Sequence, residues 1–340
     1  MRLVDGIKKP LRRLLDWQGA RRAPARWASL EGSLLVLSYH RVLPRDFPEL
    51  GVVEPGMYVF EDTFRMQMEL LAEYFEPVDL ADWLRQRESG GDLPRRAAAI
   101  TFDDGWRDNY EYAFPVLREL RLPATIFAVT GLAGTDYSFW PERLARRLEA
   151  AAKNPAVTGN PWLDSLLEDA GLGLQGLNAE GISRVIAVAK RGSDSDNHRQ
   201  LDLLDERFGP VLPVQGRDLA DWSELAAMRD SGCIRIGSHT RHHVRMSEDL
   251  SPAELEEQVV GSRREIEQKL GAAPELFCYP NGDITPAAAA LVRDNYRGAC
   301  TTQNGWNTRS TRAHEIRRVP LHEDRSCSPD AFLARLAGAL

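Results

Sequence analysis

The chain has 340 residues, of which 43% are apolar and 27% are charged, and its formal net charge is -7. This composition is ordinary for a globular protein, which excludes a fibrous or disordered class, and the length suffices for one large α/β domain. The acidic balance argues against a general nucleic-acid-binding protein. The 4 cysteines include no C-x-x-C pair, so neither a zinc ribbon nor a redox motif is predicted.

Residues 1–30 form a basic N-terminal segment in which Leu3, Ile7 and Leu11 fall at helical spacing. Such a segment predicts a helix that either docks on the domain or contacts an anionic membrane surface. Charged residues interrupt the first apolar stretch, so we expect no cleaved signal peptide, and no later apolar run has the length of a membrane-spanning helix. We therefore expect a cytoplasmic protein, with peripheral contact at the inner membrane face as an alternative.

From residue 33 onward, short apolar runs alternate with helical patterns, as they do in repeated βα units around a mostly parallel sheet. The number of runs predicts a barrel-like closure. The predicted strands are Ser33–His40, Ala97–Asp104, Ala124–Gly131, Ile234–Thr240, Leu276–Gly282, Arg297–Gln303 and Glu315–His322. The predicted helices between them are Glu61–Tyr74, Asp108–Leu120, Trp222–Ser231, Ser251–Leu270 and Pro286–Asn295.

One segment interrupts this alternation. Between Gly134 and Asp221 no strand-like run occurs, and short amphipathic helical patterns follow one another instead. We predict a helical insertion at about residues 135–220 within a barrel domain of residues 31–340. Its predicted helices are Arg143–Ala152, Trp162–Ala170, Ile182–Ala189 and Gln200–Phe208.

Two adjacent carboxylates, Asp103 and Asp104, stand where the second predicted strand ends, directly before Gly105. Active sites of parallel α/β proteins lie at the carboxyl ends of the strands. A metal bound by one carboxylate would keep the pair ionised and leave the other as a base. Taken alone, the Asp-Asp-Gly tripeptide is more typical of an ordinary turn.

A second polar cluster, Ser238–His243, follows the strand-like run that begins at Ile234. Because His239 and His243 are four residues apart, one helical turn would present both imidazoles to the same side. With one carboxylate they complete a two-histidine, one-carboxylate set with open positions. That set is suited to Zn²⁺ and is possible for other divalent metals.

Three ordered motifs resemble those of the polysaccharide deacetylase family, also called carbohydrate esterase family four, which shares the NodB-homology domain. They are Thr101–Gly105, His239–His243 and Phe277–Gly282, which are weak alone and strong together. The resemblance covers roughly Leu34 to the C-terminus, apart from the insertion. The resemblance implies a distorted seven-stranded (β/α) barrel, which agrees with the strand count above. It also implies that the protein acts as a metal-dependent polysaccharide N-deacetylase.

The resemblance also implies roles for individual residues. Asp103 is the expected base, and Asp104 is the expected metal ligand together with His239 and His243. The metal would most simply be Zn²⁺, with Co²⁺, Mn²⁺ or Ni²⁺ as alternatives. Tyr279 is expected to donate its backbone N–H to the oxyanion.

Further positions are expected to border the substrate or orient the base. By resemblance, Trp222 would form an apolar wall beside the acetyl methyl group, although a core tryptophan is an equal alternative, and Pro280 would contact the glycan. Phe277–Cys278 stands where many members of the family carry an arginine. Arg318 shares strand parity with His322 and is our candidate to orient the base instead.

Protonation of the amine leaving group needs a general acid. His40 ends the first predicted strand, and the run Tyr39–Val42 resembles the opening of a family subgroup in which this histidine replaces a late catalytic histidine. His322 ends the last predicted strand but precedes charged residues typical of a solvated loop. We expect His40 rather than His322 to be the acid.

The expected reaction is the hydrolysis of N-acetyl groups on N-acetylhexosamine residues of a polysaccharide or lipid-linked glycan, in envelope or exopolysaccharide metabolism. Hydrolysis of a non-glycan C–N bond, in a cyclic imide or a ureide, is a second hypothesis that the motifs do not exclude. A catalytically silent glycan-binding module is a third, which the retained ligand and base candidates disfavour.

Overall fold

The structure is a computed structural model that describes residues 2–154, 160–175, 177–247 and 249–338. The chain forms two compact units. The first, here called the barrel unit, comprises Met1–Pro44, Tyr58–Gly134 and Ala220–Leu340. The second, here called the helical unit, comprises Arg45–Met57 and Thr135–Leu219. Inclusion of Arg45–Met57 in the helical unit was not predicted from the sequence.

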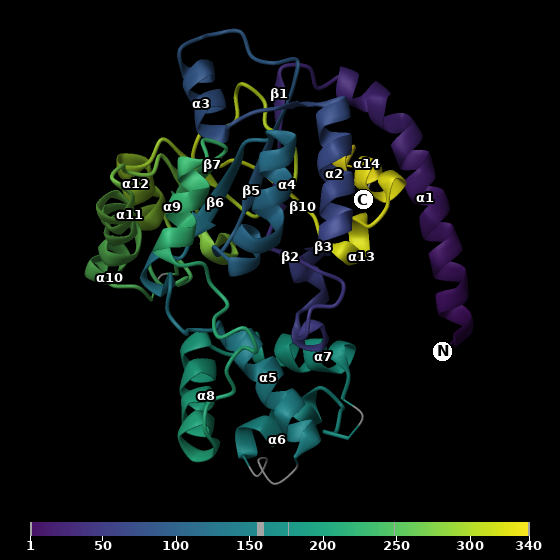
Figure 1. Ribbon diagram of the computed structural model, residues 1–340, viewed down its shortest axis with the longest axis vertical. Coiled ribbons are helices and arrows are strands. Elements are labelled where there is room, and N and C mark those ends of the chain that lie inside the picture. The colour runs from purple at the N-terminus through teal and green to yellow at the C-terminus, as the bar shows by residue number, and fades with distance from the viewer. Residues whose placement is uncertain (1, 155–159, 176, 248, 339–340) are drawn as a thin grey trace. The chain divides into compact units, whose positions relative to one another are not determined.

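The barrel unit is built on a parallel sheet with strand order β10-β1-β5-β6-β7-β8-β9. Figure 1 labels β10, β1, β5, β6 and β7 of this sheet. A parallel bridge between Cys300 and Ile316 joins the end of β9 to the chain that leads into β10, so the sheet curls towards closure. The predicted α/β barrel class is confirmed, and each predicted run overlaps one of these strands. The strands are β1 (Ser33–Tyr39), β5 (Arg96–Phe102), β6 (Ala124–Ala128), β7 (Ile234–Ser238), β8 (Leu276–Cys278), β9 (Gly298–Cys300) and β10 (Val319–Pro320).

Alternate residues of the strands face opposite sides of the sheet. Leu35 and Leu37 of β1 belong to the core that includes Phe64 of helix α2, whereas Leu34 and Val36 belong to a second buried cluster with alanines of β5 and both cysteines of β8 and β9. The second cluster is the barrel interior. Three short strands complete the unit, namely β2 (Arg41–Leu43) paired with β3 (Tyr58–Phe60), and β4 (Glu76–Pro77) on β5.

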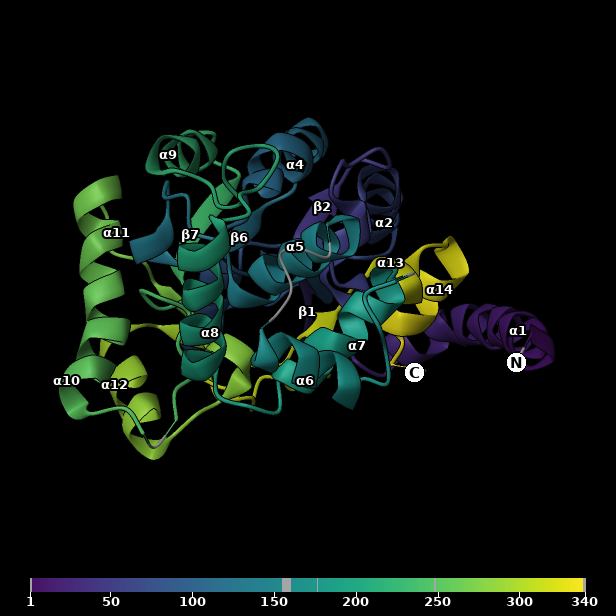
Figure 2. The ribbon, with the colours of Figure 1, turned by 90° about the horizontal axis from the view of Figure 1, so that it is seen from below.

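Helices cover the outer face of the sheet, and α10, α11 and α12 lie together on one side of it in both views (Figures 1 and 2). The predicted helix start at Ser251 is confirmed, because Ser251 and Glu254 form a capping box. The helical segment ends at Gly271, which has a φ of 75°. Helices α3, α13 and α14 were missed. The helices are α1 (Arg2–Ala28), α2 (Glu61–Tyr74), α3 (Leu80–Glu88), α4 (Phe114–Leu120), α9 (Trp222–Asp230), α10 (Pro252–Glu256), α11 (Ser262–Leu270), α12 (Pro286–Asn295), α13 (Glu323–Ser326) and α14 (Pro329–Leu336). Single π-helical turns, η3 (Asn109–Ala113) and η6 (Glu257–Gly261), precede α4 and α11.

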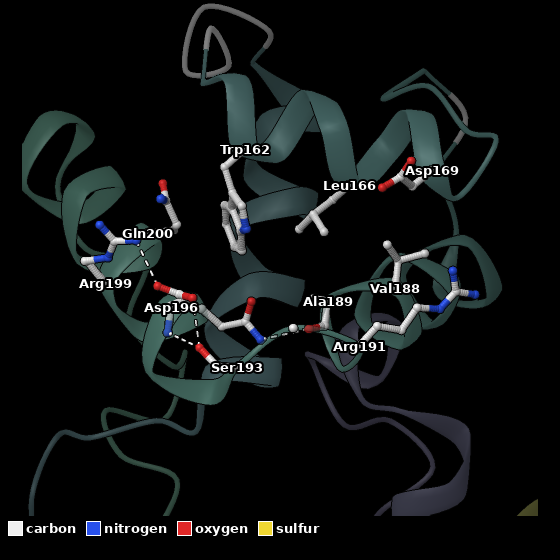
Figure 3. A pocket seen from close by; sticks show the side chains of 12 residues that line it. Trp162, Leu166, Asp169, Val188, Ala189, Arg191, Ser193, Asp196, Arg199 and Gln200 are labelled. Carbon is white, nitrogen blue, oxygen red and sulfur yellow. Dashed lines mark hydrogen bonds and ion pairs between the residues drawn. The ribbon is translucent and has the colours of Figure 1, made fainter. Parts of the chain in front are cut away.

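The helical unit contains α5 (Trp140–Lys153), α6 (Pro161–Asp169), α7 (Ala179–Ala189) and α8 (Asp194–Phe208), around an apolar core of its own. Buried Arg146 donates to Glu49 at 2.8 Å and to Asp218 at 2.7 Å, and so joins both segments of the unit. A cavity of about 410 Å³ opens between α6, α7 and α8, with Trp162 and Leu166 pointing into it (Figure 3).

Candidate active site

The candidate active site lies where the barrel strands end. Asp103 and Asp104 follow β5, while His40 follows β1 and His239 follows β7. Asp103 extends the sheet by one residue, because its N–H donates to the Tyr39 carbonyl at 3.0 Å. Since the strands are parallel, their carboxyl ends meet at one edge, and residues from distant parts of the sequence come together there.

A tight turn separates the two aspartates. Asp104 and Gly105 have φ values of 70° and 76°, in the left-handed region that favours glycine. A Cβ atom on Gly105 would lie 3.2 Å from Cα of Ala128, so the turn packs directly on β6. The turn takes the chain out of the sheet after Asp103, and the two successive carboxylates consequently meet different partners.

Asp104 lies beside both predicted histidine ligands. Its Oδ1 atom lies 3.4 Å from Nε2 of His239 and 3.4 Å from Nε2 of His243. The Nδ1 atom of His239 lies 2.8 Å from the Cys278 carbonyl, which can only accept, so Nδ1 carries a proton and Nε2, which faces Asp104, is the nitrogen left to bind a metal. The structure thus brings Asp104, His239 and His243 together as a group that could hold a metal ion.

The donor set fits a divalent metal. Among the described residues, Oδ1 of Asp104 is buried and has no hydrogen-bond donor, which is costly unless a cation binds there. Burial raises the pKa of the Asp104 carboxyl, but the nearby imidazoles of His239 and His243 outweigh it and hold this pKa well below its ordinary value. Burial lowers the pKa of His243 to about 4, which keeps this imidazole neutral and able to bind a metal near pH 7.

A second group of possible ligands overlaps the first and fits less well. It consists of Asp103, His239 and Cys278. Burial raises the pKa of the Cys278 thiol well above its ordinary value, whereas the thiolate is the form that binds metals. Both carboxylate oxygens of Asp103 are already occupied by Arg318. Asp104, His239 and His243 are therefore the better metal site.

Arg318 holds Asp103 in a two-pronged hydrogen bond. Its Nη1 and Nη2 atoms donate to Oδ1 and Oδ2 of Asp103 at 2.7 and 2.8 Å, and both side chains are buried. Burial raises the pKa of the Asp103 carboxyl, but the charge and hydrogen bonds of Arg318 outweigh it and lower this pKa to about 2. The Sγ atom of Cys278 lies 3.6 Å from Oδ1 of Asp103, so the cysteine at the expected arginine position also faces the base.

The two candidate acids have different surroundings. Nε2 of His40 lies 3.9 Å from Oδ2 of Asp103, and its side chain is 31% exposed, so a substrate can reach it. His322 precedes α13, where its Nδ1 atom contacts Asp324 and its carbonyl accepts from Ser326. Among the contacts of the described residues, those of His40 reach the base and those of His322 do not.

The prediction for Tyr279 is wrong. Its backbone N–H donates to the Cys300 carbonyl at 3.1 Å and continues the pairing of β8 with β9, so this N–H is not available to an oxyanion. Pro280 begins a short 3₁₀ turn directly after Tyr279 and is buried. Trp222 begins α9 and packs, half-buried, against the main core of the barrel unit, which favours the alternative of a core tryptophan.

Trp106 had no predicted role, yet its Nε1–H donates to Oδ2 of Asp104 at 2.8 Å. The side chain of Arg41 lies over its ring, with Cζ 4.3 Å from the ring centroid. The only signal in the sequence was the position of Trp106 directly after Asp-Asp-Gly. Arg41 is distant in sequence and could not be connected to it without the fold.

Comparison with known proteins identifies the family of the chain. The model of the family described as polysaccharide deacetylase matches residues 90–159 and 177–297. The poly-beta-1,6-N-acetyl-D-glucosamine N-deacetylase of Staphylococcus epidermidis is 34% identical over 113 residues, which are 31% of this chain and 39% of that protein. Its namesake in Staphylococcus aureus strain N315 is 30% identical over 122 residues, 34% of this chain and 42% of that protein. The matches thus span about two fifths of the length of these curated relatives.

Solved structures share the fold. The Streptococcus pyogenes deacetylase PplD, in complex with acetate, superposes with a TM-score of 0.57 at 16% identity, over 87% of this chain and 96% of that chain. IcaB from Ammonifex degensii superposes with a TM-score of 0.53 at 19% identity, over 91% and 97% of the two chains. Because the family model matches more than half of the sequence, the chain belongs to the polysaccharide deacetylase family.

Proposed function

We propose that the protein is a metal-dependent hydrolase that removes N-acetyl groups from N-acetylhexosamine residues of a polysaccharide or lipid-linked glycan. The observation that carries this proposal is the pairing of two carboxylates with separate partners, Asp104 with two imidazoles and Asp103 with Arg318. The names of the curated relatives, which are poly-N-acetylglucosamine N-deacetylases, support the choice of substrate.

Asp104, His239 and His243 would hold the metal, for which Zn²⁺ is our first choice and Co²⁺, Mn²⁺ and Ni²⁺ are alternatives. When bound, a divalent metal lowers the pKa of water and polarises the acetyl carbonyl. The His239 ring is held for this task by its hydrogen bond to the Cys278 carbonyl.

Asp103 would accept the proton of the attacking water. Its lowered pKa keeps it ionised near neutral pH, and the two hydrogen bonds from Arg318 fix the plane of its carboxylate. Arg318 is thus a positioning residue that takes the part of the arginine absent at Cys278. Because the pair is buried, its geometry is set before the substrate binds.

His40 would protonate the amine leaving group. Its Nε2 atom lies beside the base, and its side chain is partly exposed, as a group that meets a substrate must be. The amide of Asn109 donates to the His40 carbonyl at 2.8 Å and holds the backbone at this point. For the oxyanion we propose the N–H of Asn281, because Pro280 has no N–H and that of Gly282 donates to the Tyr279 carbonyl.

Acetate release from an N-acetylglucosamine oligomer tests this function. We expect release by the protein loaded with Zn²⁺ or Co²⁺, loss of release after chelation, and no recovery on metal addition to Asp104→Asn. Turnover of a small cyclic imide without acetate release would favour the non-glycan hydrolase instead. Glycan binding without bound metal and without acetate release would favour the silent module.

We further propose that the N-terminal helix contacts an anionic membrane surface, such as the cytoplasmic leaflet of an inner membrane. Among the helices that the structure describes, none is long and apolar enough to cross a membrane. Leu14, Leu15 and Trp17 of α1 are nevertheless exposed, and Arg21 lies 4.7 Å from the ring centroid of Trp17. Apolar side chains beside cations, in a chain that is acidic as a whole, suit the interface of anionic lipids.

Vesicle co-sedimentation tests the membrane proposal. We expect binding to vesicles that contain phosphatidylglycerol, little binding to pure phosphatidylcholine, and loss of binding in Leu14→Glu. Leu203→Glu is the matched control, because both leucines are 49% exposed and Leu203 lies in the helical unit. Equal loss in both variants, or no binding by the unmodified protein, would contradict the proposal.

A further inference from the structure

Trp106 contacts the carboxylate of Asp104 through the oxygen that does not face the histidines. Its indole is 1% exposed, and its Nε1–H donates to Oδ2 of Asp104 at 2.8 Å. An indole N–H is a donor only, so the direction of this hydrogen bond is certain. The charge on the acceptor makes it stronger than a bond between neutral groups.

The two oxygens of Asp104 therefore have separate surroundings. Oδ2 accepts from Trp106, while Oδ1 lies 3.4 Å from Nε2 of both His239 and His243. Among the described residues Oδ1 has no hydrogen-bond donor. One oxygen is thus held by the protein, and the other is left to a cation.

Arg41 and its partner Asp108 hold the indole in place. The guanidinium of Arg41 lies over its ring, with Cζ 4.3 Å from the centroid, and Nε of Arg41 donates to Oδ2 of Asp108 at 2.8 Å. The other oxygen of Asp108 accepts from the backbone N–H of Val42 at 3.0 Å. Arg41 and Asp108 are 3% and 4% exposed, so the arrangement is closed off from solvent, where a cation and an aromatic face attract each other most strongly.

We propose that Trp106 is a positioning residue that restricts metal binding by Asp104 to its Oδ1 atom, and that Arg41 and Asp108 hold the indole in place for this purpose. The inference rests on the proposed metal site and deepens it. Residues that orient metal ligands in this way typically change metal affinity by about 10- to 100-fold when they are altered. Loss of the Trp106 N–H should have an effect of that size.

The test measures Zn²⁺ affinity by competition with a chromogenic chelator, and so needs no substrate. Trp106→Phe keeps an aromatic ring beneath Arg41 but removes the N–H. Trp83→Phe is the matched control, because Trp83 is also 1% exposed, lies beneath Arg87 at 5.2 Å, and has an Nε1 atom without a partner among the described residues. Should Trp106→Phe fail to fold, 3-benzothienylalanine at position 106 removes the N–H while keeping the bicyclic ring.

We expect Trp106→Phe to bind Zn²⁺ about 10- to 100-fold more weakly and Trp83→Phe to bind it as the unmodified protein does. Unchanged affinity in Trp106→Phe, or an equal loss in both variants, would overturn the inference. Failure of the unmodified protein to bind Zn²⁺, or undiminished binding by Asp104→Asn, would instead overturn the proposed metal site. The two failures are therefore distinguishable.

Discussion

Replacement of Arg318 by methionine should damage both stability and catalysis. The guanidinium is 3% exposed and donates twice to Asp103, which is 4% exposed. Removing one partner of such a buried ion pair typically costs about 3–5 kcal/mol of the free energy of unfolding, since the other charge stays buried without compensation. Because a mispositioned base loses much of its contribution, we also expect kcat to fall by about 100-fold or more.

The same variant should respond to pH in a predictable direction. Without Arg318, burial is opposed only by the charges of His239 and His40, so the pKa of the Asp103 carboxyl should rise from its present low value. A proton then removes the uncompensated charge, so the loss of unfolding free energy should shrink as the pH falls. Arg318→Lys keeps the charge but cannot donate two parallel hydrogen bonds, and we expect it to lie between the unmodified protein and Arg318→Met.

Arg146→Met is the matched control for these measurements. Arg146 is also 3% exposed and binds two carboxylates, but it lies in the helical unit. Urea unfolding of the metal-free proteins and steady-state acetate release should show a comparable stability loss in both variants and a fall in kcat in Arg318→Met alone. An unchanged kcat in Arg318→Met, or an equal fall in Arg146→Met, would refute the positioning role.

Three further predictions concern the acid, the turn and an acid-sensitive ion pair. His40→Asn should lower kcat for acetate release by about 10²–10⁴-fold while His322→Asn leaves it unchanged, and the reverse order would identify His322 as the acid. A residue other than glycine costs roughly 1–2 kcal/mol in the left-handed region. Gly105→Ala should lower the free energy of unfolding in urea by more than this amount, because the added Cβ would also contact Ala128. Gly271→Ala, with open space, should cost only that amount. Burial raises the pKa of the Glu275 carboxyl, but hydrogen bonds from Arg85 and Arg297 outweigh it and lower this pKa below its ordinary value of 4.5. The ionised carboxylate therefore stabilises the fold above pH 4.5, and this contribution is lost as the pH falls through the lowered pKa. Glu275→Gln should therefore show a weaker loss of unfolding free energy between neutral and acid pH, and an unchanged acid dependence would contradict this reasoning.

The strands could be predicted from the sequence because each is a short and mostly buried run, and such runs are largely apolar. Strand ends were less predictable. The run Leu276–Gly282 contains only three strand residues, since the chain turns at Pro280. Helix α3 was missed because Leu80, Trp83 and Leu84 pack with the interior residues of the barrel, and a sequence alone does not say what closes a barrel.

The grouping of Asp104, His239 and His243 could be predicted because these residues come from two short motifs with fixed spacing. Arg318 could be connected to Asp103 by strand parity, which depends only on the twofold period of a strand. Tyr279 was assigned wrongly because the pairing of its N–H with Cys300 depends on a neighbouring strand. The contact of Arg41 with Trp106 could not be predicted from the sequence for the same reason, because it joins segments that only the folded sheet brings together.

X-ray absorption at the zinc edge of the Zn²⁺-loaded protein tests whether Asp104, His239 and His243 hold the metal, because it reports the ligand atoms themselves. We predict scattering from two imidazoles and from oxygen, with one imidazole lost in His243→Ala. A sulfur neighbour at about 2.3 Å would place the metal on Cys278 with Asp103 and His239, and would contradict the account.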